Sequence, residues 1–385
     1  MQADYSSLMP IANRPDIVFE SGNGSWLTDT QGNNYLDFIQ GWAVNTLGHC
    51  PPVMVETLTK QAAKLINSSP AFYNPNMLEC ADLLTANSVF DQVFFTNSGA
   101  EANEGAIKLA RKWGQARKSG AWKIITFENG FHGRTLTTMA ASGKAAFDKL
   151  FEPKTPGFVR VPYNDAKAVA DAIDQDTVAI MLEPVQGEAG VIPAQDDFVK
   201  ELRRLADEHQ LLLIFDEVQT GVGRTGELFA YTHYGIEPDI MTLGKGLGGG
   251  VPIAAQLAKK HCSVFEFGDQ GGTYNGNPLM TAVASTILRE VLQPGFLEQV
   301  RATSLYLQKK LSELSEQFGL GKVRGKGLIL ALDTAEVDAT QVAAAALQQN
   351  LLINAPRANT LRFVPALNVT EAEIDEMIVR LAKVL

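Results

Sequence analysis

Lys245 lies in the segment DIMTLGKGLGGG, directly after an apolar run and between glycines. Flanking glycines leave the backbone free to bring the lysine amine close to a ligand. A lysine amine acts as a nucleophile when its pKa is lowered, and Schiff-base formation with a carbonyl group is its usual use. Taken alone, the segment is also typical of a surface lysine in a flexible loop.

Asp216 ends the apolar run LLLIFD. A carboxylate at the end of so apolar a strand is costly unless a partner group compensates it. A pyridinium nitrogen is a suitable partner, because a ring that stays protonated acts as an electron sink. The alternative is an aspartate that caps a neighbouring loop.

Ser98, Gly99 and Ala100 stand at the predicted start of a helix, where free N–H groups and the helix dipole favour an anion such as phosphate. Ser98 also suits a simple helix cap, and the two roles are compatible. Phe131 offers a ring face and Arg134 a guanidinium for a carboxylate, although each is equally typical of a core phenylalanine or a surface arginine. Together with Lys245 and Asp216, these groups are what pyridoxal phosphate requires.

The glycines of the lysine segment also match a different motif. Gly244, Gly246 and Gly249 satisfy G-x-G-x-x-G, the dinucleotide-binding pattern, and they follow a predicted strand. That pattern requires a helix to open at the glycines. Here the chain continues as VPIAAQLA, which predicts another strand, so the match is weak.

Short apolar runs alternate with helical patterns between residues 90 and 260, which predicts an α/β fold with a mostly parallel sheet covered by helices on both faces. The predicted strands are VFFT (93–96), KIITF (123–127), VAIMLEP (178–184), LLLIFDE (211–217) and DIMTL (239–243). Ligands bind outside the carboxyl ends of such strands. The segments that follow them are therefore expected to form one site: 97–100, 131–134, 183–188, 216–219 and 244–246.

Two helix starts carry capping-box patterns, Ser98 with Glu101 and Thr370 with Glu373. After residue 270, long helices alternate with short strands such as GLILAL and TLRFVPA. We expect three parts: an N-terminal segment (1–50) that packs with the small domain, a large cofactor-binding domain (51–270), and a smaller α+β domain (271–385).

Composition excludes several classes of function. The net charge of −10 argues against a nucleic-acid-binding surface. The three cysteines are expected to be free thiols in a reducing compartment, and the histidines show no metal-ligand spacing. The N-terminus lacks the pattern of a signal peptide, and no stretch approaches the roughly 20 apolar residues of a membrane helix. We therefore expect a cytoplasmic protein without a metal site or membrane contact.

Nearly the whole chain resembles the class III aminotransferases of fold type I. The resemblance rests on the segments AVNTLGH, FFTNSGAEANEGAIKLARKW, ENGFHGRTLTTMAASG, LEPVQGEAGV, LIFDEVQTGVGRTG, LGKGLGGGVPIAA, GGTYNGNPL and LRFVPAL. It implies the pyridoxal-phosphate-dependent transferase fold and pyridoxal 5′-phosphate as cofactor. It also implies a homodimer with shared active sites.

The resemblance implies roles for individual residues. Lys245 would be the Schiff-base lysine and proton shuttle, Asp216 the partner of the pyridine nitrogen, and Glu188 a third catalytic residue. The implied cofactor-binding residues are Ser98, Gly99, Ala100, Phe131, His132, Glu183, Asp216, Gln219, Lys245 and, from the partner subunit, Thr273. Arg362 would bind the carboxylate beside the reacting carbon and Arg134 the distal one, with Glu188 pairing Arg362 when no such carboxylate is present.

The implied reaction moves the δ-amino group of N2-acetylornithine to 2-oxoglutarate, giving N-acetylglutamate 5-semialdehyde and glutamate, a step of arginine biosynthesis. Some segments depart from the family pattern, among them Pro51 after GHC, 69–74 near the substrate entrance and Tyr274-Asn275 after Thr273. These departures bear on the donor. Succinylornithine, N-succinyldiaminopimelate, ornithine and 4-aminobutyrate therefore stay open as donors. So do two other classes: an aminomutase or racemase, and a non-catalytic binding or regulatory protein.

Overall fold

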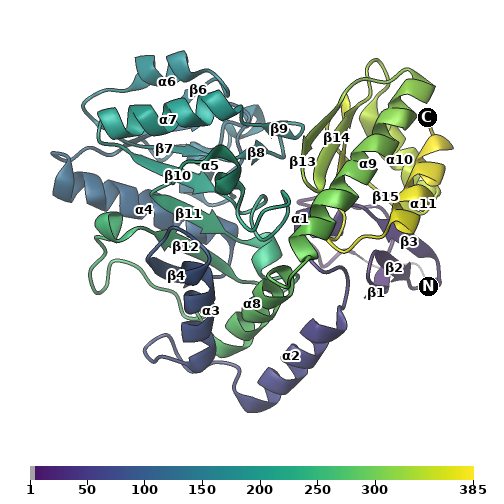
Figure 1. Ribbon diagram of the computed structural model, residues 1–385, viewed down its shortest axis with the longest axis horizontal. Helices are drawn as coiled ribbons and strands as arrows, with labels where there is room; N and C mark the ends of the chain where they lie inside the picture. Colours follow the sequence, from purple (N-terminus) through teal and green to yellow (C-terminus); the bar gives the residue numbers. More distant parts are fainter. Residues whose placement is uncertain (1–4) are drawn as a thin grey trace.

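The computed structural model describes residues 5–385, and residues 1–4 of the predicted N-terminal segment lie outside this range. Figure 1 shows two parts side by side, a larger one built on a central sheet and a smaller one that holds the C-terminus. The larger sheet has seven strands in the order β4-β12-β11-β10-β7-β5-β6. Their bounds are Gln92–Thr96 (β4), Lys123–Phe127 (β5), Phe158–Val161 (β6), Thr177–Leu182 (β7), Leu212–Asp216 (β10), Ile240–Leu243 (β11) and Ala254–Ala258 (β12).

The central sheet is mostly parallel, as predicted. Strands β11, β10, β7, β5 and β6 pair in parallel, and only β12 runs antiparallel to its neighbours β11 and β4. All five predicted strands are present, and the segment after Gly249 leads into strand β12 and not into a helix. The glycines hold only a three-residue 3-10 helix, Lys245–Leu247, and no α-helix opens there, so the dinucleotide-binding interpretation is excluded.

Helices cover both faces of this sheet, and the alternation of side chains along β10 shows it. Leu213 and Phe215 pack in one buried cluster with α7 (Asp196–Glu208), whereas Leu212 and Ile214 pack in another with α4 (Gly99–Arg117). Successive strand residues point to opposite faces, so a strand that is apolar throughout must be covered on both. The larger part also contains α5 (Leu136–Ala141), α6 (Ala166–Ala172), β8 (Val185–Gln186) and β9 (Ile192–Pro193).

Three helices pack together beside the sheet edge formed by β4, below the sheet in Figure 1. They are α2 (Pro52–Lys64), α3 (Pro75–Ala86) and α8 (Pro278–Val291), and α8 packs against both of the others. The domain boundary predicted at residue 270 would place α8 in the small domain and its partners α2 and α3 in the large domain. We propose instead that the large domain ends near Gly295, where the backbone turns into α9 with a positive φ of 87°.

The smaller part has an antiparallel sheet with the order β13-β14-β17-β16. The long helix α9 packs on its strands β13 and β14, and α11 packs on α9. The bounds are Phe296–Phe318 (α9), Val323–Lys326 (β13), Ile329–Asp333 (β14), Ala339–Gln348 (α10), Asn354–Arg357 (β16), Thr360–Phe363 (β17) and Glu371–Ala382 (α11).

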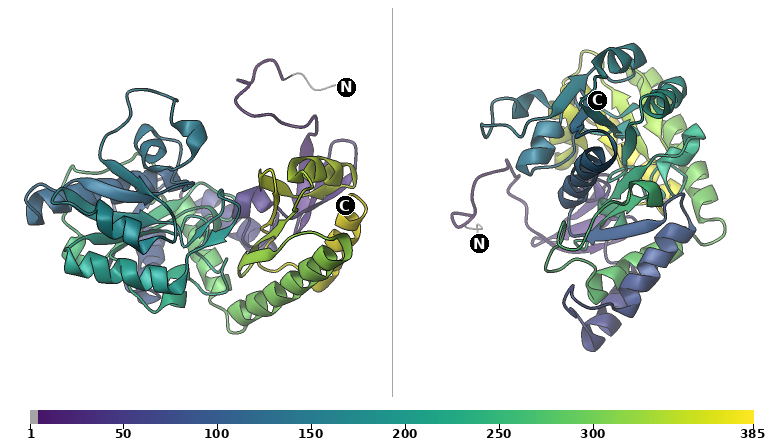
Figure 2. Two further views of the ribbon diagram at one scale, coloured as in Figure 1. Left: turned by 90° about the horizontal axis from the view of Figure 1, so that it is seen from above. Right: turned by 90° about the vertical axis from the view of Figure 1, so that its left-hand side faces the viewer.

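A second small sheet joins the two ends of the chain. Strands β1 (Phe19–Asn23), β2 (Trp26–Asp29) and β3 (Asn34–Asp37) form an antiparallel meander, and β15 (Leu351–Leu352) pairs with β3 in parallel. Figure 2 shows this purple N-terminal segment beside the yellow C-terminal elements. The short α1 (Gln40–Ala43) then leads the chain across to the large domain.

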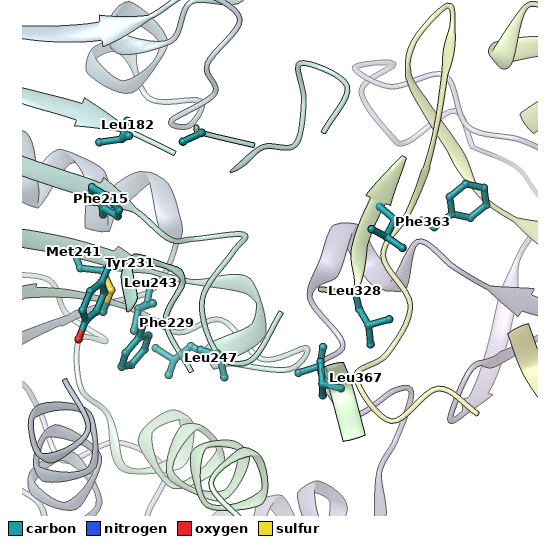
Figure 3. Packing of buried hydrophobic residues seen from close by; sticks show 14 of the residues in the cluster. Leu182, Phe215, Phe229, Tyr231, Met241, Leu243, Leu247, Leu328, Phe363 and Leu367 are labelled. Carbon is teal, nitrogen blue, oxygen red and sulfur yellow. The ribbon is translucent and has the colours of Figure 1, made fainter. Parts of the chain in front are cut away.

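The junction between the two parts is itself apolar core. Figure 3 shows Leu243 and Leu247 of the large domain on one side, and Leu328 and Leu367 of the small domain on the other. All four belong to one buried cluster. The buried Arg224 also crosses this junction, because its Nη1 donates to the carbonyls of Leu328 (2.9 Å) and Pro365 (2.5 Å). The junction is therefore held by both packing and hydrogen bonds.

The two predicted capping boxes have different outcomes. At α11, Thr370 and Glu373 cap each other's backbone N–H groups as predicted. At α4, Ser98 Oγ accepts from Glu101 N, but Glu101 Oε2 accepts from the N–H of Asn97 (2.6 Å) and not from that of Ser98. The reciprocal half of this prediction is wrong, because the Asn97 side-chain amide also donates to Glu101 and draws its carboxylate one residue back.

Candidate active site

The segments that follow β4, β5, β7, β10 and β11 meet at the carboxyl edge of the central sheet, on the side that faces the small domain in Figure 1. They enclose a cavity of about 390 Å³. Its lining residues are Ser98, Gly99, Ala100, Asn103, Phe131, His132, Gly133, Arg134, Glu183, Asp216, Val218, Gln219 and Lys245. Nine of the ten predicted cofactor-binding residues are therefore brought together.

Asp216 is a buried carboxylate whose oxygens both accept hydrogen bonds. Its Oδ2 lies 2.8 Å from His132 Nδ1 and accepts from Asn103 Nδ2 at 2.8 Å, and its Oδ1 accepts from the N–H of Val218 at 3.1 Å. Burial lowers the pKa of His132, but the hydrogen bond to Asp216 and the charges of Asp216 and Glu183 together outweigh burial and raise that pKa above its ordinary value. Asp216 is thus held in one orientation, with both of its oxygens engaged.

Asn103 is a residue of this site that the sequence analysis missed. It lies on the buried face of α4, and besides Asp216 it donates to the backbone carbonyl of His132 at 2.7 Å. Its own Oδ1 accepts from Thr242 Oγ1 at 2.7 Å. The available signal was a polar residue within an apolar helix face, since a buried amide must find partners.

Lys245 follows β11 after one glycine and has a positive φ of 39°, which is uncommon for a residue with a side chain. Burial, and to a smaller extent the charge of Arg362, lower the pKa of its amine, while the carboxylates of Glu188, Asp216 and Glu183 raise it. The net pKa is below the ordinary value of a lysine. A lowered pKa favours the neutral amine, which is the nucleophilic form.

The start of α4 also lines the cavity. Gly99 and Ala100 lie in the first helical turn, whose N–H groups have no acceptor within the helix. A Cβ atom at Gly99 would lie 2.6 Å from Val218 Cγ1, so only glycine fits there. The resulting open backbone is suited to an anion such as phosphate.

Glu183 binds the loop that follows β5. Its Oε1 accepts from the N–H of Phe131 at 2.8 Å, and burial raises its pKa to about 8. Phe131 lines the cavity, and its ring lies 5.9 Å from the guanidinium of Arg134, which is also 5.0 Å from the ring of Phe147. Arg134 is thereby held at the mouth of the cavity by two aromatic rings.

Arg362 and Glu188 do not line this cavity but form an ion pair beside it. Arg362 Nη1 donates to Glu188 Oε1 at 2.8 Å, and the arginine side chain is fully buried although it comes from β17 of the small domain. Burial raises the pKa of Glu188, but the charge and hydrogen bond of Arg362, together with the charges of Lys245 and Lys144, outweigh burial and hold that pKa below its ordinary value. A Cβ atom at Gly187 would collide with Gln219 Oε1 and lie 3.2 Å from Arg362 Nη1, so the ion pair lies beside Gln219, which lines the same cavity as Lys245.

Two buried nitrogens of the site have no hydrogen-bond partner among residues 5–385, Gln219 Nε2 and Arg362 Nη2. Gln219 lines the cavity, and a Cβ atom at Gly187 would collide with its Oε1. A buried donor without a partner is costly, which indicates that a ligand supplies the acceptor. Both donors therefore point to polar oxygens of a bound molecule.

Thr273 is the predicted cofactor-binding residue that this chain does not bring to its own cavity. It is exposed, in the turn between β12 and α8, and does not line the cavity. The adjacent Asn275 accepts a hydrogen bond from Asn97 Nδ2 at 2.8 Å, so the turn lies near the start of α4. In residues 5–385, no group of His, Cys, Asp and Glu side chains could hold a metal ion, and no helix has the length and apolar character needed to cross a membrane.

The comparison with protein families covers almost the entire chain. A model of the family described as "Aminotransferase class-III" matches residues 10–385. The chain belongs to the class III aminotransferases. Enzymes of this class are aminotransferases that use pyridoxal 5′-phosphate, so the predicted reaction type, cofactor and fold are confirmed.

Several class III aminotransferases are similar to this chain in sequence, and solved structures are similar to it in fold. It is 59% identical to the acetylornithine aminotransferase of Ralstonia nicotianae, over 98% of this chain and 96% of the relative. The solved N-acetylornithine aminotransferase of Stenotrophomonas maltophilia is 38% identical, covering 96% of this chain and 95% of the other, with a TM-score of 0.84. The ornithine aminotransferase of Toxoplasma gondii is 31% identical, with 98% and 92% covered and a TM-score of 0.93.

The residues of the cavity fit pyridoxal 5′-phosphate. Asp216 presents a buried carboxylate for a pyridinium nitrogen, Gln219 Nε2 offers an unused donor for a ring oxygen, and the α4 N-terminus suits the phosphate. Lys245 has the lowered pKa that attachment to an aldehyde requires. When bound, this cofactor supplies an electron-withdrawing ring that stabilises negative charge at the substrate carbon.

Proposed function

We propose that this aminotransferase moves the δ-amino group of N2-acetylornithine to 2-oxoglutarate, giving N-acetylglutamate 5-semialdehyde and glutamate, as a step of arginine biosynthesis. The observation that carries the proposal is the fully buried Arg362 paired with Glu188 beside the cavity that Lys245 lines. The acetylornithine aminotransferases that are 59% and 38% identical to this chain support the same donor.

The ion pair suits an enzyme with two dissimilar substrates. 2-Oxoglutarate and glutamate carry a carboxylate beside the reacting carbon, and Arg362 Nη2 is a free donor for it. An ω-amine has no carboxylate there, which would leave a buried guanidinium unpaired at a cost of about 3–5 kcal/mol. Glu188 removes that cost by pairing with Arg362, and it must move aside in the other half-reaction.

The remaining residues have simpler roles in the proposal. Lys245 holds the cofactor covalently, and its Nζ then carries a proton to and from the reacting carbon. Asp216, oriented by His132 and Asn103, holds the proton on the ring nitrogen. Phe131 covers one ring face, and Arg134 binds the distal carboxylate of the acceptor.

We further propose a cytoplasmic homodimer in which Thr273 reaches the phosphate of the partner subunit. Thr273 is exposed and does not line the cavity of its own subunit, which supports this arrangement. The measurement is the oligomeric state in solution, combined with the cofactor affinity of Thr273→Ala. A dimer in which this substitution leaves the affinity unchanged would contradict the shared site.

The experiment for the reaction is the visible absorbance of the purified holoenzyme, recorded before and after adding N2-acetylornithine without a keto acid. We expect the band to bleach and to return with 2-oxoglutarate. If N2-acetylornithine leaves the band unchanged while ornithine, succinylornithine or another ω-amine bleaches it, the donor assignment is wrong. An aminomutase or racemase would instead turn over without any keto-acid co-substrate.

A further inference from the structure

Lys144 is a second cation at the carboxylate of Glu188. Its Nζ lies 3.8 Å from Glu188 Oε2, while Arg362 Nη1 occupies the other oxygen, Oε1, at 2.8 Å. The carboxylate therefore lies between two positive charges, each on a different oxygen. Lys144 also lies over the ring of Phe147, at 5.8 Å, the same ring that Arg134 contacts.

The backbone holds Lys144 firmly in this place. The preceding residue, Gly143, donates to the carbonyl of Gly130 at 3.0 Å and accepts from the N–H of Asn129 at 2.9 Å. A Cβ atom at Gly143 would collide with the carbonyl of Phe127, the last residue of β5. Only glycine allows this close approach, which fixes the lysine that follows at the same strand end as the site.

The two cations differ in freedom. The side chain of Arg362 is fully buried, and its Nε donates to Asn354 Oδ1 at 3.2 Å, whereas the side chain of Lys144 is 31% exposed. A lysine has a long flexible stem and can follow a moving carboxylate, which the fixed arginine cannot. The Glu188 side chain is 26% exposed, so it is less confined than that of Arg362, and its Oε2 already lies 3.8 Å from Lys144 Nζ.

We propose that Lys144 is a positioning residue that receives Glu188 whenever Arg362 binds the carboxylate of an α-amino or 2-oxo acid. The inference rests on the proposed function, because it takes the Glu188–Arg362 exchange as given. Without Lys144, Glu188 would have to leave Arg362 for solvent alone. Lys144 thus lowers the cost of the glutamate half-reaction and leaves the ω-amine half-reaction, in which Glu188 stays on Arg362, nearly unaffected.

The test compares Lys144→Gln with the parent holoenzyme. Equilibrium titration with glutarate, which has two carboxylates but does not react, reports binding at Arg362 without turnover. We expect its Kd, and the apparent binding constant for glutamate in single-turnover bleaching, to rise about fivefold, or about 1 kcal/mol at 1.4 kcal/mol per factor of ten. The limiting rate of bleaching with glutamate should change less than about twofold. The apparent binding constant and limiting rate for the ω-amine should also change less than about twofold, because Glu188 then stays on Arg362 and its partly exposed contact with Lys144 is weak.

Matched variants separate this role from a structural one. Lys144→Arg should restore glutarate binding, and Lys149→Gln, which removes an exposed lysine from the same segment, should leave it unchanged. In a Glu188→Gln background, Lys144→Gln should have no further effect, because coupled residues are not additive. A fivefold loss that persists in this background would mean that Lys144 contacts the ligand itself, and would overturn the proposal.

The same variants distinguish failure of this inference from failure of the proposed function. The Glu188–Arg362 exchange predicts that Glu188→Gln strengthens glutarate binding and slows the reaction of the ω-amine. If either effect is absent, the exchange itself is wrong. If Glu188→Gln shows that asymmetry while Lys144→Gln leaves glutarate binding unchanged, only the role of Lys144 is overturned.

Discussion

The two ends of the active site are built differently. At the cofactor end, the Asp216 carboxylate accepts from Asn103 and Val218 and contacts His132, and Glu183 binds a loop N–H. At the substrate end, Arg362 Nη2 has no hydrogen-bond partner among the described residues. The Glu188 carboxylate is shared there between Arg362 and the partly exposed Lys144. A cofactor that stays bound calls for fixed partners, whereas two alternating substrates call for a charge that can change its partner.

The largest expected effect comes from the residue between the two ends. Lys245→Ala should lower kcat by about 10⁴-fold or more, because it removes both the attachment point of the cofactor and the group that carries the proton. Loss of a general acid–base group alone lowers a rate by about 10²- to 10⁴-fold. Transamination rates measured with added pyridoxal phosphate check this, with the far-ultraviolet circular dichroism spectrum as control for folding. A variant that keeps wild-type turnover would contradict the role of Lys245.

A substitution at the cofactor end should affect both half-reactions alike. Asp216→Asn keeps the shape of the side chain but removes the charge opposite the ring nitrogen. We expect a loss of about 10²- to 10³-fold in both half-reactions, since breaking a buried charge pair costs about 3–5 kcal/mol. Single-turnover bleaching with each amino donor measures it, and a loss confined to one donor would show that Asp216 acts on the substrate.

A substitution at the substrate end should instead separate the half-reactions. Glu188→Ala leaves Arg362 unpaired when an ω-amine is bound, so kcat/KM for that donor should fall by about 10²-fold. For glutamate it should change by less than about fivefold, because its carboxylate pairs with Arg362. The same bleaching experiment decides the matter, and equal losses with both donors would exclude Glu188 as the switch.

The smallest effect is expected from the support of the cofactor end. Asn103→Ala removes a hydrogen bond to a charged group, which is worth about 1.5–3 kcal/mol, so the affinity for pyridoxal phosphate should fall about 10- to 100-fold. Fluorescence titration of the apoenzyme measures it. Asn103→Asp is a sharper companion, because a second carboxylate beside Asp216 should weaken binding further; tighter binding would show that Asn103 does not act through Asp216.

The sequence predicts the cofactor end better than the substrate end. Lys245 and Asp216 each follow a recognisable apolar strand, and parallel strands bring their carboxyl ends to one edge. The partner of Asp216 on α4, Asn103, escaped notice, because a polar residue in an apolar helix face indicates that it has a partner but not which one. Lys144 escaped for a similar reason, since its place depends on how Gly143 packs against β5.

The family resemblance supplied Arg362 and Glu188, which periodicity could not have brought together. They lie 174 positions apart and on different domains. The helical layer was also difficult to predict, since α8 is close in sequence to the small domain yet packs on α2 and α3. Elements of this kind depend on long-range packing that local patterns do not encode.

The pairing of β3 with β15 has a consequence for biosynthesis. Leu36 lies opposite Leu351, about 315 residues later in the chain, which at about 5–20 residues per second means a delay of about 15–60 s on the ribosome. During that time the N-terminal meander has an open strand edge with no partner, and such edges are prone to pair with other chains. The newly made chain is therefore most in need of a chaperone before its last thirty or so residues emerge.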